Sequence, residues 1–285
     1  ADGNSKQEAM KGGYSAILCS PDFVYLRQNA GKLNDFALAS RLSYFLWSSM
    51  PDETLMDLAR RGKLSQPGEL RRQVERMLGD SRSAALTRHF PERWLKLHEL
   101  GRMEPDRKGP YGEYFRVKDD LVPQVDAFFA NLLKQNGPIR DLIDSDYTFM
   151  NQRLGEMIYR QKVVGENFRK VTLEDPRRGG ILTMPAVMTV TANGVDTSPI
   201  VRGVYVLENI LGTPTPPPPP DIEPLSPDLR GLTTLKQQLA AHRDQAACNS
   251  CHRRIDPLGF SLESFDPIGR WRETYPKTDK KARQG

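Results

Sequence analysis

The sequence predicts a mainly α-helical chain. Apolar residues recur at three- and four-residue spacing in several segments, which is the pattern of an amphipathic helix. Asn, Asp, Ser and Pro stand just before these segments, and Gly follows several of them, as expected at helix starts and ends. Convincing alternation of apolar and polar residues is scarce, so little β-strand is expected.

The first predicted helices form a bundle inside a helical domain, residues 32–172, which follows a lead-in segment, residues 1–31. Each helix has a capping residue or a Pro at or near its start, and the five are expected to begin at Asn34, Pro51, Gln66, Ser83 and Asp119. The third should end at Gly79, the fourth at Leu100 and the fifth at Lys134. Pro123 is tolerated because it falls near the first turn of the fifth helix.

The second half is predicted to be less regular. A middle segment, residues 173–213, contains one clear helix that starts with Ser198 as N-cap and ends before Gly212. Residues 214–227 form a Pro-rich linker, because a run of prolines adopts an extended polyproline II conformation. Residues 228–285 then form a small helical domain, in which a helix at about 232–247 leads into a cysteine motif.

Composition excludes several function classes. The chain has 285 residues, 27% of them charged, and a formal net charge of +5. This charge is too small and too scattered to indicate a nucleic-acid partner. No apolar run approaches the ~20 residues that span a bilayer, so no transmembrane segment is expected. The 3 cysteines provide no disulfide framework.

The most informative motif is Cys248-Asn249-Ser250-Cys251-His252, which has the C-x-x-C-H spacing of covalent haem attachment. Two thiols three residues apart can each form a thioether to a vinyl group of the porphyrin. The histidine that follows lies under the iron and supplies an axial imidazole. The motif predicts one covalently bound haem c, held by Cys248, Cys251 and His252.

Two other kinds of site use similar cysteine spacing. A structural zinc site needs four ligands and usually pairs one C-x-x-C with another, and no second pair is present. A thioredoxin-like redox motif follows a strand, whereas the segment before Cys248 is predicted to be helical. Haem attachment is therefore the favoured interpretation.

Several strings resemble one family across nearly the whole chain. They are Phe36 to Trp47, Gly179 to Leu182, Thr197 to Gly203 with the proline run that follows, and Asn249 to Arg272. Together these strings resemble the planctomycete-type multidomain cytochrome c proteins, whose domains are mostly catalogued as of unknown function. Family members usually carry more sequence at both ends, so the chain is expected to be a processed or partial piece.

The resemblance carries further expectations. Proteins of this type attach haem outside the cytoplasm, which implies a periplasmic or cell-surface location, although no signal peptide is present in this chain. In small cytochromes c, a Pro-Leu-Gly element after the motif packs on the haem, and its backbone carbonyl accepts the Nδ1 proton of the axial histidine. By that likeness, Asp256, Pro257 or their neighbours orient His252. The alternative is that Pro257 and Gly259 only form a turn.

The sixth iron ligand is not evident. No Met or His follows His252, so a ligand from this chain must come from upstream. Met184, Met188 and His242 are the candidates, although a pair of methionines at helical spacing also suits a core and a His also suits a surface. Arg202 and Arg243 are candidates to pair with the haem propionates.

Three functions are consistent with these features. The leading one is electron transfer through the haem to a redox protein partner or to other subunits of a larger assembly. The second is a haem enzyme, peroxidase- or oxidase-like, with an open sixth position, which the lack of a downstream Met or His favours. The third is a structural subunit of a larger complex. Beyond the haem motif, the sequence lacks Ser-His-Asp, phosphate-loop and dinucleotide motifs.

Overall fold

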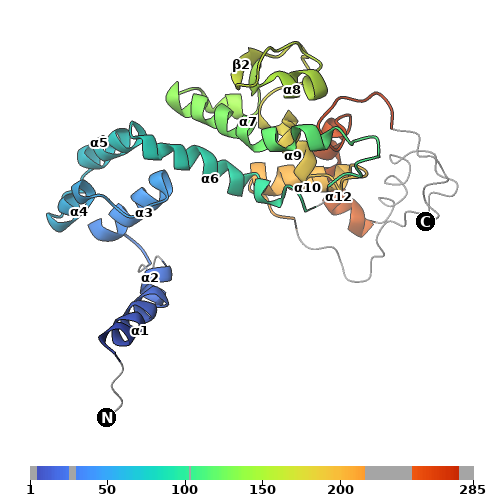
Figure 1. Ribbon diagram of the computed structural model, residues 1–285. Helices are drawn as coiled ribbons and strands as arrows, with labels where there is room; N and C mark the ends of the chain where they lie inside the picture. Colours follow the sequence, from blue (N-terminus) through green and yellow to red (C-terminus); the bar gives the residue numbers. More distant parts are fainter. Residues whose placement is uncertain (1–4, 26–29, 103, 216–245, 276–285) are drawn as a thin grey trace. The chain divides into compact units, whose positions relative to one another are not determined.

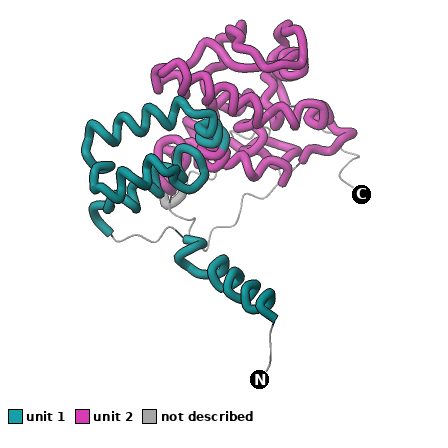
Figure 2. The backbone as a smooth tube through the Cα atoms, turned by 60° about the vertical axis from the view of Figure 1, so that its left-hand side comes forward, with its two compact units in different colours: residues 1–88 teal, residues 89–285 magenta. Residues whose placement is uncertain are grey.

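The computed structural model describes residues 5–25, 30–102, 104–215 and 246–275. It confirms the mainly α-helical fold class (Figure 1). The chain forms two compact units, residues 1–88 and 89–285 (Figure 2). The division falls inside the predicted helical domain, so the predicted domain boundaries do not coincide with it.

Unit 1 contains short helices, several of which begin at the capping residues expected from the sequence. Its elements are α1 (Lys6–Leu18), α2 (Pro21–Val24), α3 (Asp35–Trp47), α4 (Glu53–Arg60), α5 (Pro67–Leu78) and η1 (Ser81–Ser83). The side chain of Asn34 accepts a hydrogen bond from the Ala37 N–H at 2.8 Å and so caps α3. Helices α3, α4 and α5 enclose a small core that includes Leu46, Trp47, Leu55 and Met77.

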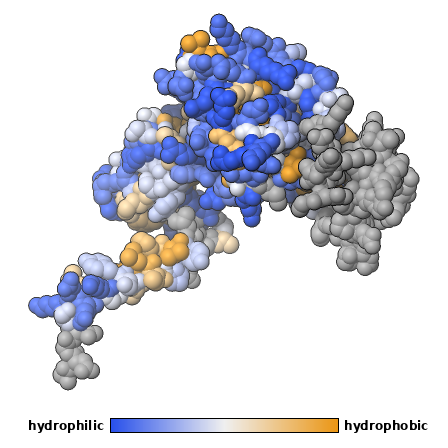
Figure 3. Space-filling view, turned by 45° about the vertical axis from the view of Figure 1, so that its right-hand side comes forward, coloured by the Kyte–Doolittle hydropathy of each residue, from blue (hydrophilic) through white to orange (hydrophobic). Residues whose placement is uncertain are grey.

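The two N-terminal helices have no buried residue. Their apolar side chains are more than half exposed, among them Met10, Ile17, Leu18, Phe23 and Val24. Figure 3 shows this surface as an orange patch over α1 and α2.

Asp52 joins two elements of unit 1 through its carboxylate. Its Oδ1 accepts from the Leu55 N–H at 3.0 Å, which caps α4, and its Oδ2 accepts from Arg76 Nη1 at 2.8 Å. Burial alone would raise the pKa of Asp52, but the hydrogen bonds from Arg76 and Leu55 and the charges of Arg76 and Arg82 together lower it below 3.8.

The lowered pKa predicts a pH-dependent contribution to stability. Since folding favours the ionised carboxylate, the contribution of Asp52 is present above pH 3.8 and is lost as the pH falls below that value. Asp52→Asn keeps a good N-cap but removes the charge, so we expect it to lower the free energy of unfolding at neutral pH by about 0.5–1 kcal/mol. Urea unfolding near pH 2 should show almost no difference between variant and wild type. An equal difference at both pH values would contradict this account.

Unit 2 is built around the long helix α7 (Tyr114–Lys134) and three helices that follow it, α9 (Pro185–Val190), α10 (Pro199–Tyr205) and α12 (Ala246–Leu262). The helix α6 (Ala84–Trp94) leads into it. The shorter elements are η2 (Leu97–Glu99), η3 (Ile139–Leu142), α8 (Gln152–Leu154), η4 (Gly155–Tyr159), η5 (Ile181–Thr183) and η6 (Val206–Ile210). Strands β1 (Tyr147–Met150) and β2 (Arg169–Thr172) pair antiparallel, with Tyr147 opposite Thr172.

Two predicted helices have different bounds in the structure, and a third is largely untested. The fourth helix ends at Trp94 rather than Leu100, and Lys96 adopts a left-handed conformation with φ of 55°. The fifth begins at Tyr114 rather than Asp119, because Tyr114 and Val117 extend its buried face upstream. Pro123 therefore lies inside α7 and not in its first turn. The helix expected at 232–247 lies outside the described residues except at its last two positions, which belong to α12.

One hydrophobic core serves the described parts of the predicted helical domain, middle segment and haem domain. It joins Val125 and Phe128 of α7, Met188 of α9, Tyr205 of α10 and Leu262 of α12. Within unit 2 these segments therefore depend on each other for burial of their apolar side chains.

Two glycines allow α10 and α12 to cross closely. A Cβ added at Gly259 of α12 would overlap the carbonyl oxygen of Pro199, and one added at Gly203 of α10 would overlap that of Ile255. Only glycine lets backbones approach to this distance. The crossing fixes α12, the helix that carries the cysteine motif, against the core of unit 2.

No helix in the described part of the chain is both long and apolar enough to cross a bilayer.

Candidate functional site

The cysteine motif lies on α12. Positions 251 and 252 stand three and four residues after position 248. In an α-helix, residues at these spacings lie on the same face. The side chain of Cys251 is partly buried, and the His252 side chain is 13% exposed. The side chain of Cys248 lies outside the described part of the structure. The helix therefore directs the three predicted attachment positions to one side.

His252 is oriented by a carboxylate on the same helix. Its Nδ1 lies 2.9 Å from Oδ1 of Asp256, whose side chain is only 2% exposed. If the carboxylate accepts this hydrogen bond, Nδ1 is the donor and carries the ring proton. The lone pair of the imidazole is then on Nε2, the nitrogen that is left to bind a metal.

This arrangement differs from the expected acceptor, a backbone carbonyl near Pro257. The helix continues through Pro257, whose side chain is exposed, and ends only at Leu262. Helical geometry brings the side chain four residues after His252 over its ring, so the Asp256 carboxylate takes the position of acceptor. Whether Pro257 contacts a haem stays a prediction.

Arg202 does not lie at the end of α12 that carries His252. It is fully buried and donates to the carbonyl oxygens of Leu262 at 2.7 Å, Phe265 at 2.6 Å and Asp266 at 3.2 Å. Burial lowers the pKa of Arg202 to about 10. Leu262 is ten residues from His252, about 15 Å along a helix. Arg202 therefore caps the C-terminal end of α12, a role that its sequence position did not suggest.

The remaining predicted residues fall into two groups. Met184 and Met188 are almost fully buried in the core of unit 2, with exposures of 1% and 0%. The core packing expected of a methionine pair is thus present, and axial ligation by either one stays a prediction. His242 and Arg243 lie outside the described residues.

A buried carboxylate that the sequence did not single out holds the segment after α12. Glu263 Oε1 accepts from Arg272 Nη2 at 3.0 Å, from the Tyr275 hydroxyl at 2.6 Å and from the Thr197 hydroxyl. Burial and this hydrogen bond raise the pKa of Tyr275. The network ties the segment after α12 to Thr197, which lies two residues before α10 begins.

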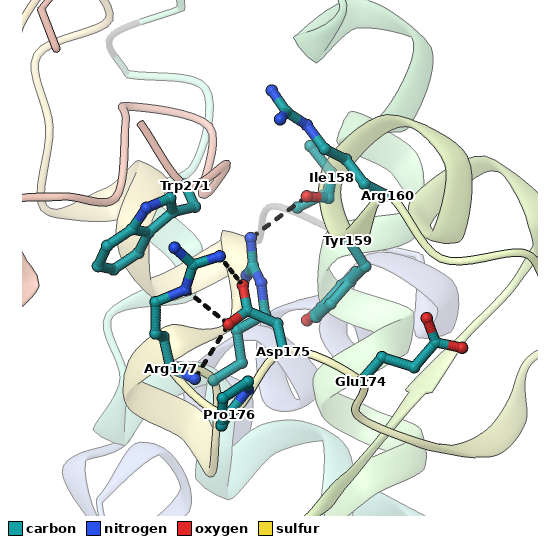
Figure 4. A pocket seen from close by; sticks show the side chains of 9 residues that line it. Ile158, Tyr159, Arg160, Glu174, Asp175, Pro176, Arg177 and Trp271 are labelled. Carbon is teal, nitrogen blue, oxygen red and sulfur yellow. Dashed lines mark hydrogen bonds and ion pairs between the residues drawn. The ribbon is translucent and has the colours of Figure 1, made fainter. Parts of the chain in front are cut away.

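A separate pocket of about 420 Å³ lies beyond the C-terminal end of α12 (Figure 4). In it, Arg177 pairs with Asp175 at 2.7 Å and stacks over the ring of Trp271. Its lining also includes Ile158, Tyr159, Arg160, Glu174, Pro176 and Arg178. Because Trp271 packs on Phe265, which follows α12, the pocket belongs to the end of the helix opposite His252.

The described residues contain no group of three or more His, Cys, Asp or Glu side chains that could hold a metal ion.

Comparisons with known families match both halves of the chain. Residues 33–159 match the family model PSD4, described as a protein of unknown function (DUF1592). Residues 178–275 match the model PSCyt3, also described as a protein of unknown function (DUF1588). No curated protein and no solved structure is significantly similar to the chain.

Proposed function

Because the chain belongs to the planctomycete-type multidomain cytochrome c proteins, we propose that it is a c-type cytochrome that transfers electrons outside the cytoplasm. In this proposal Cys248 and Cys251 attach one haem covalently, and His252 is an axial ligand of its iron. The partner is a redox protein or another subunit of a larger assembly.

The geometry of His252 is the observation that carries the proposal. The helix brings positions 248, 251 and 252 to one face, and His252 Nδ1 lies 2.9 Å from the Asp256 carboxylate, a contact that supports Nε2 as the nitrogen that binds iron in this proposal. Histidines that bind a metal through one ring nitrogen usually donate the N–H of the other to a carboxylate, a carbonyl or water. When bound, the haem supplies a one-electron iron couple, which is the chemistry of an electron carrier.

The test is the optical and electron paramagnetic resonance spectra of the purified chain in both oxidation states, together with its mass. We expect the mass of one haem to be added to the polypeptide and the colour to stay with the protein after acid–acetone extraction. We also expect rapid, reversible electron exchange with small redox mediators. Extraction of all colour, or a polypeptide of unmodified mass, would refute the proposal.

A haem enzyme with an open sixth position is the second candidate. It is favoured by the burial of Met184 and Met188 in the core, where their packing partners are apolar side chains of unit 2. Immediate carbon monoxide binding by the reduced protein, with turnover of peroxide, would favour it over the electron carrier. A low-spin spectrum that azide and cyanide leave unchanged would exclude it.

A further inference from the structure

The carboxylate that lies against the His252 ring is buried. Asp256 is 2% exposed and His252 is 13% exposed, so water is largely excluded from their 2.9 Å contact. A charge in such surroundings acts on its neighbour more strongly than one at the surface, because solvent screens it less. Since one turn of α12 separates the two residues, the helix holds the carboxylate at the ring.

We propose that Asp256 lowers the reduction potential of the haem iron by acting on His252. This inference rests on the proposed function, because it assumes that His252 is the axial ligand. A hydrogen bond to an ionised carboxylate is roughly twice as strong as one to a neutral acceptor such as a backbone carbonyl. Asp256 thus draws the Nδ1 proton toward itself and raises the electron density at Nε2, which makes this nitrogen a more basic ligand.

A more basic axial nitrogen stabilises the oxidised iron relative to the reduced iron. The chain is therefore suited to give electrons to its partner at low potential. Asp256 is a positioning residue in this account, since it acts on the iron only through the imidazole. Two cations, Arg253 and Arg254, stand nearby in sequence but are exposed, so solvent screens their opposing effect.

The test compares midpoint potentials of the haem-loaded full chain by potentiometric titration. Asp256→Asn keeps the size of the side chain and an acceptor oxygen but removes the charge, and Asp256→Ser is a second neutral variant. We expect the ferric-to-ferrous equilibrium to shift at least tenfold toward the ferrous form in both, a rise of about 59 mV for a one-electron couple. Asp266→Asn is the matched control. It removes an equally buried carboxylate, 3% exposed, that is bonded to Arg270 rather than to His252, and it should leave the potential unchanged.

The outcomes separate this inference from the proposed function. Absence of haem from the wild-type chain would count against the proposed function and not against the role of Asp256. Wild-type potentials in the neutral variants would overturn the inference. If neither neutral variant retains haem, Asp256→Glu decides. Retention of haem by the Glu variant supports a need for the charge, and its loss there as well assigns Asp256 a packing role and overturns the inference.

Discussion

Replacement of both Cys248 and Cys251 by alanine is expected to abolish covalent haem attachment. Each thioether needs one of the two thiols, so the double variant has no sulfur left in the motif. The purified variant should lack the added mass of one haem and should show no haem stain on a denaturing gel. Protein yield and helical content should be compared with wild type, because a haem that is part of the core also contributes to folding.

The chain provides its own control for this experiment. Cys19 is an exposed free cysteine at the C-terminal end of α1, in the other compact unit. Cys19→Ala should keep the full haem content. Haem mass retained by the double variant, or lost from Cys19→Ala, would show that the cofactor is attached elsewhere.

Gly259→Ala, which adds a single methyl group, is expected to lower the stability of unit 2 strongly. Alanine is a better helix former than glycine by about 1 kcal/mol, so on propensity alone the variant would be more stable. The added Cβ instead overlaps the backbone oxygen of Pro199, which can yield only if α10 and α12 move apart. We expect the free energy of unfolding to fall by about 3 kcal/mol or more. Urea unfolding followed by circular dichroism measures this loss.

Gly68→Ala in α5 is the matched control. An added Cβ there meets nothing within 4 Å, so the substitution should be neutral or stabilising by up to about 1 kcal/mol. If Gly259→Ala and Gly68→Ala unfolded at the same urea concentration, α10 and α12 would not be in direct backbone contact. A weakened crossing should also lower haem content, because α12 carries the attachment motif.

Local signals in the sequence predicted several helix starts closely. Asn34, Asp52, Pro67 and Ser198 all stand where helices begin, because capping and proline preferences depend on only a few neighbouring residues. The strands β1 and β2 escaped prediction because four residues are too few to show a period of two. They are held by tertiary bonds, such as the one from Gln124 to the Phe149 carbonyl at 2.8 Å.

The candidate site likewise combines features that the sequence predicts with features that it does not. The spacing of Cys248, Cys251 and His252 is a local property, and the motif was therefore recognisable from the sequence. The role of Arg202 was not, since its acceptors lie some sixty residues further along the chain. The glycine crossing left a signal that could have been used: Gly203 and Gly259 stand inside helices, where glycine costs stability unless close packing requires it.

Short-range features of the amino-acid sequence were enough to predict the helical class, the caps that start α3, α4 and α10, and the cysteine motif, because each depends on residues within a turn or two of one another. Three features became visible only in the folded chain: α10 and α12 cross at glycines, Arg202 caps the end of α12, and one core unites α7, α9, α10 and α12. Those features depend on which segments, far apart in the sequence, pack together and exclude water from their apolar side chains. Short stretches of sequence do not show which segments will pack together.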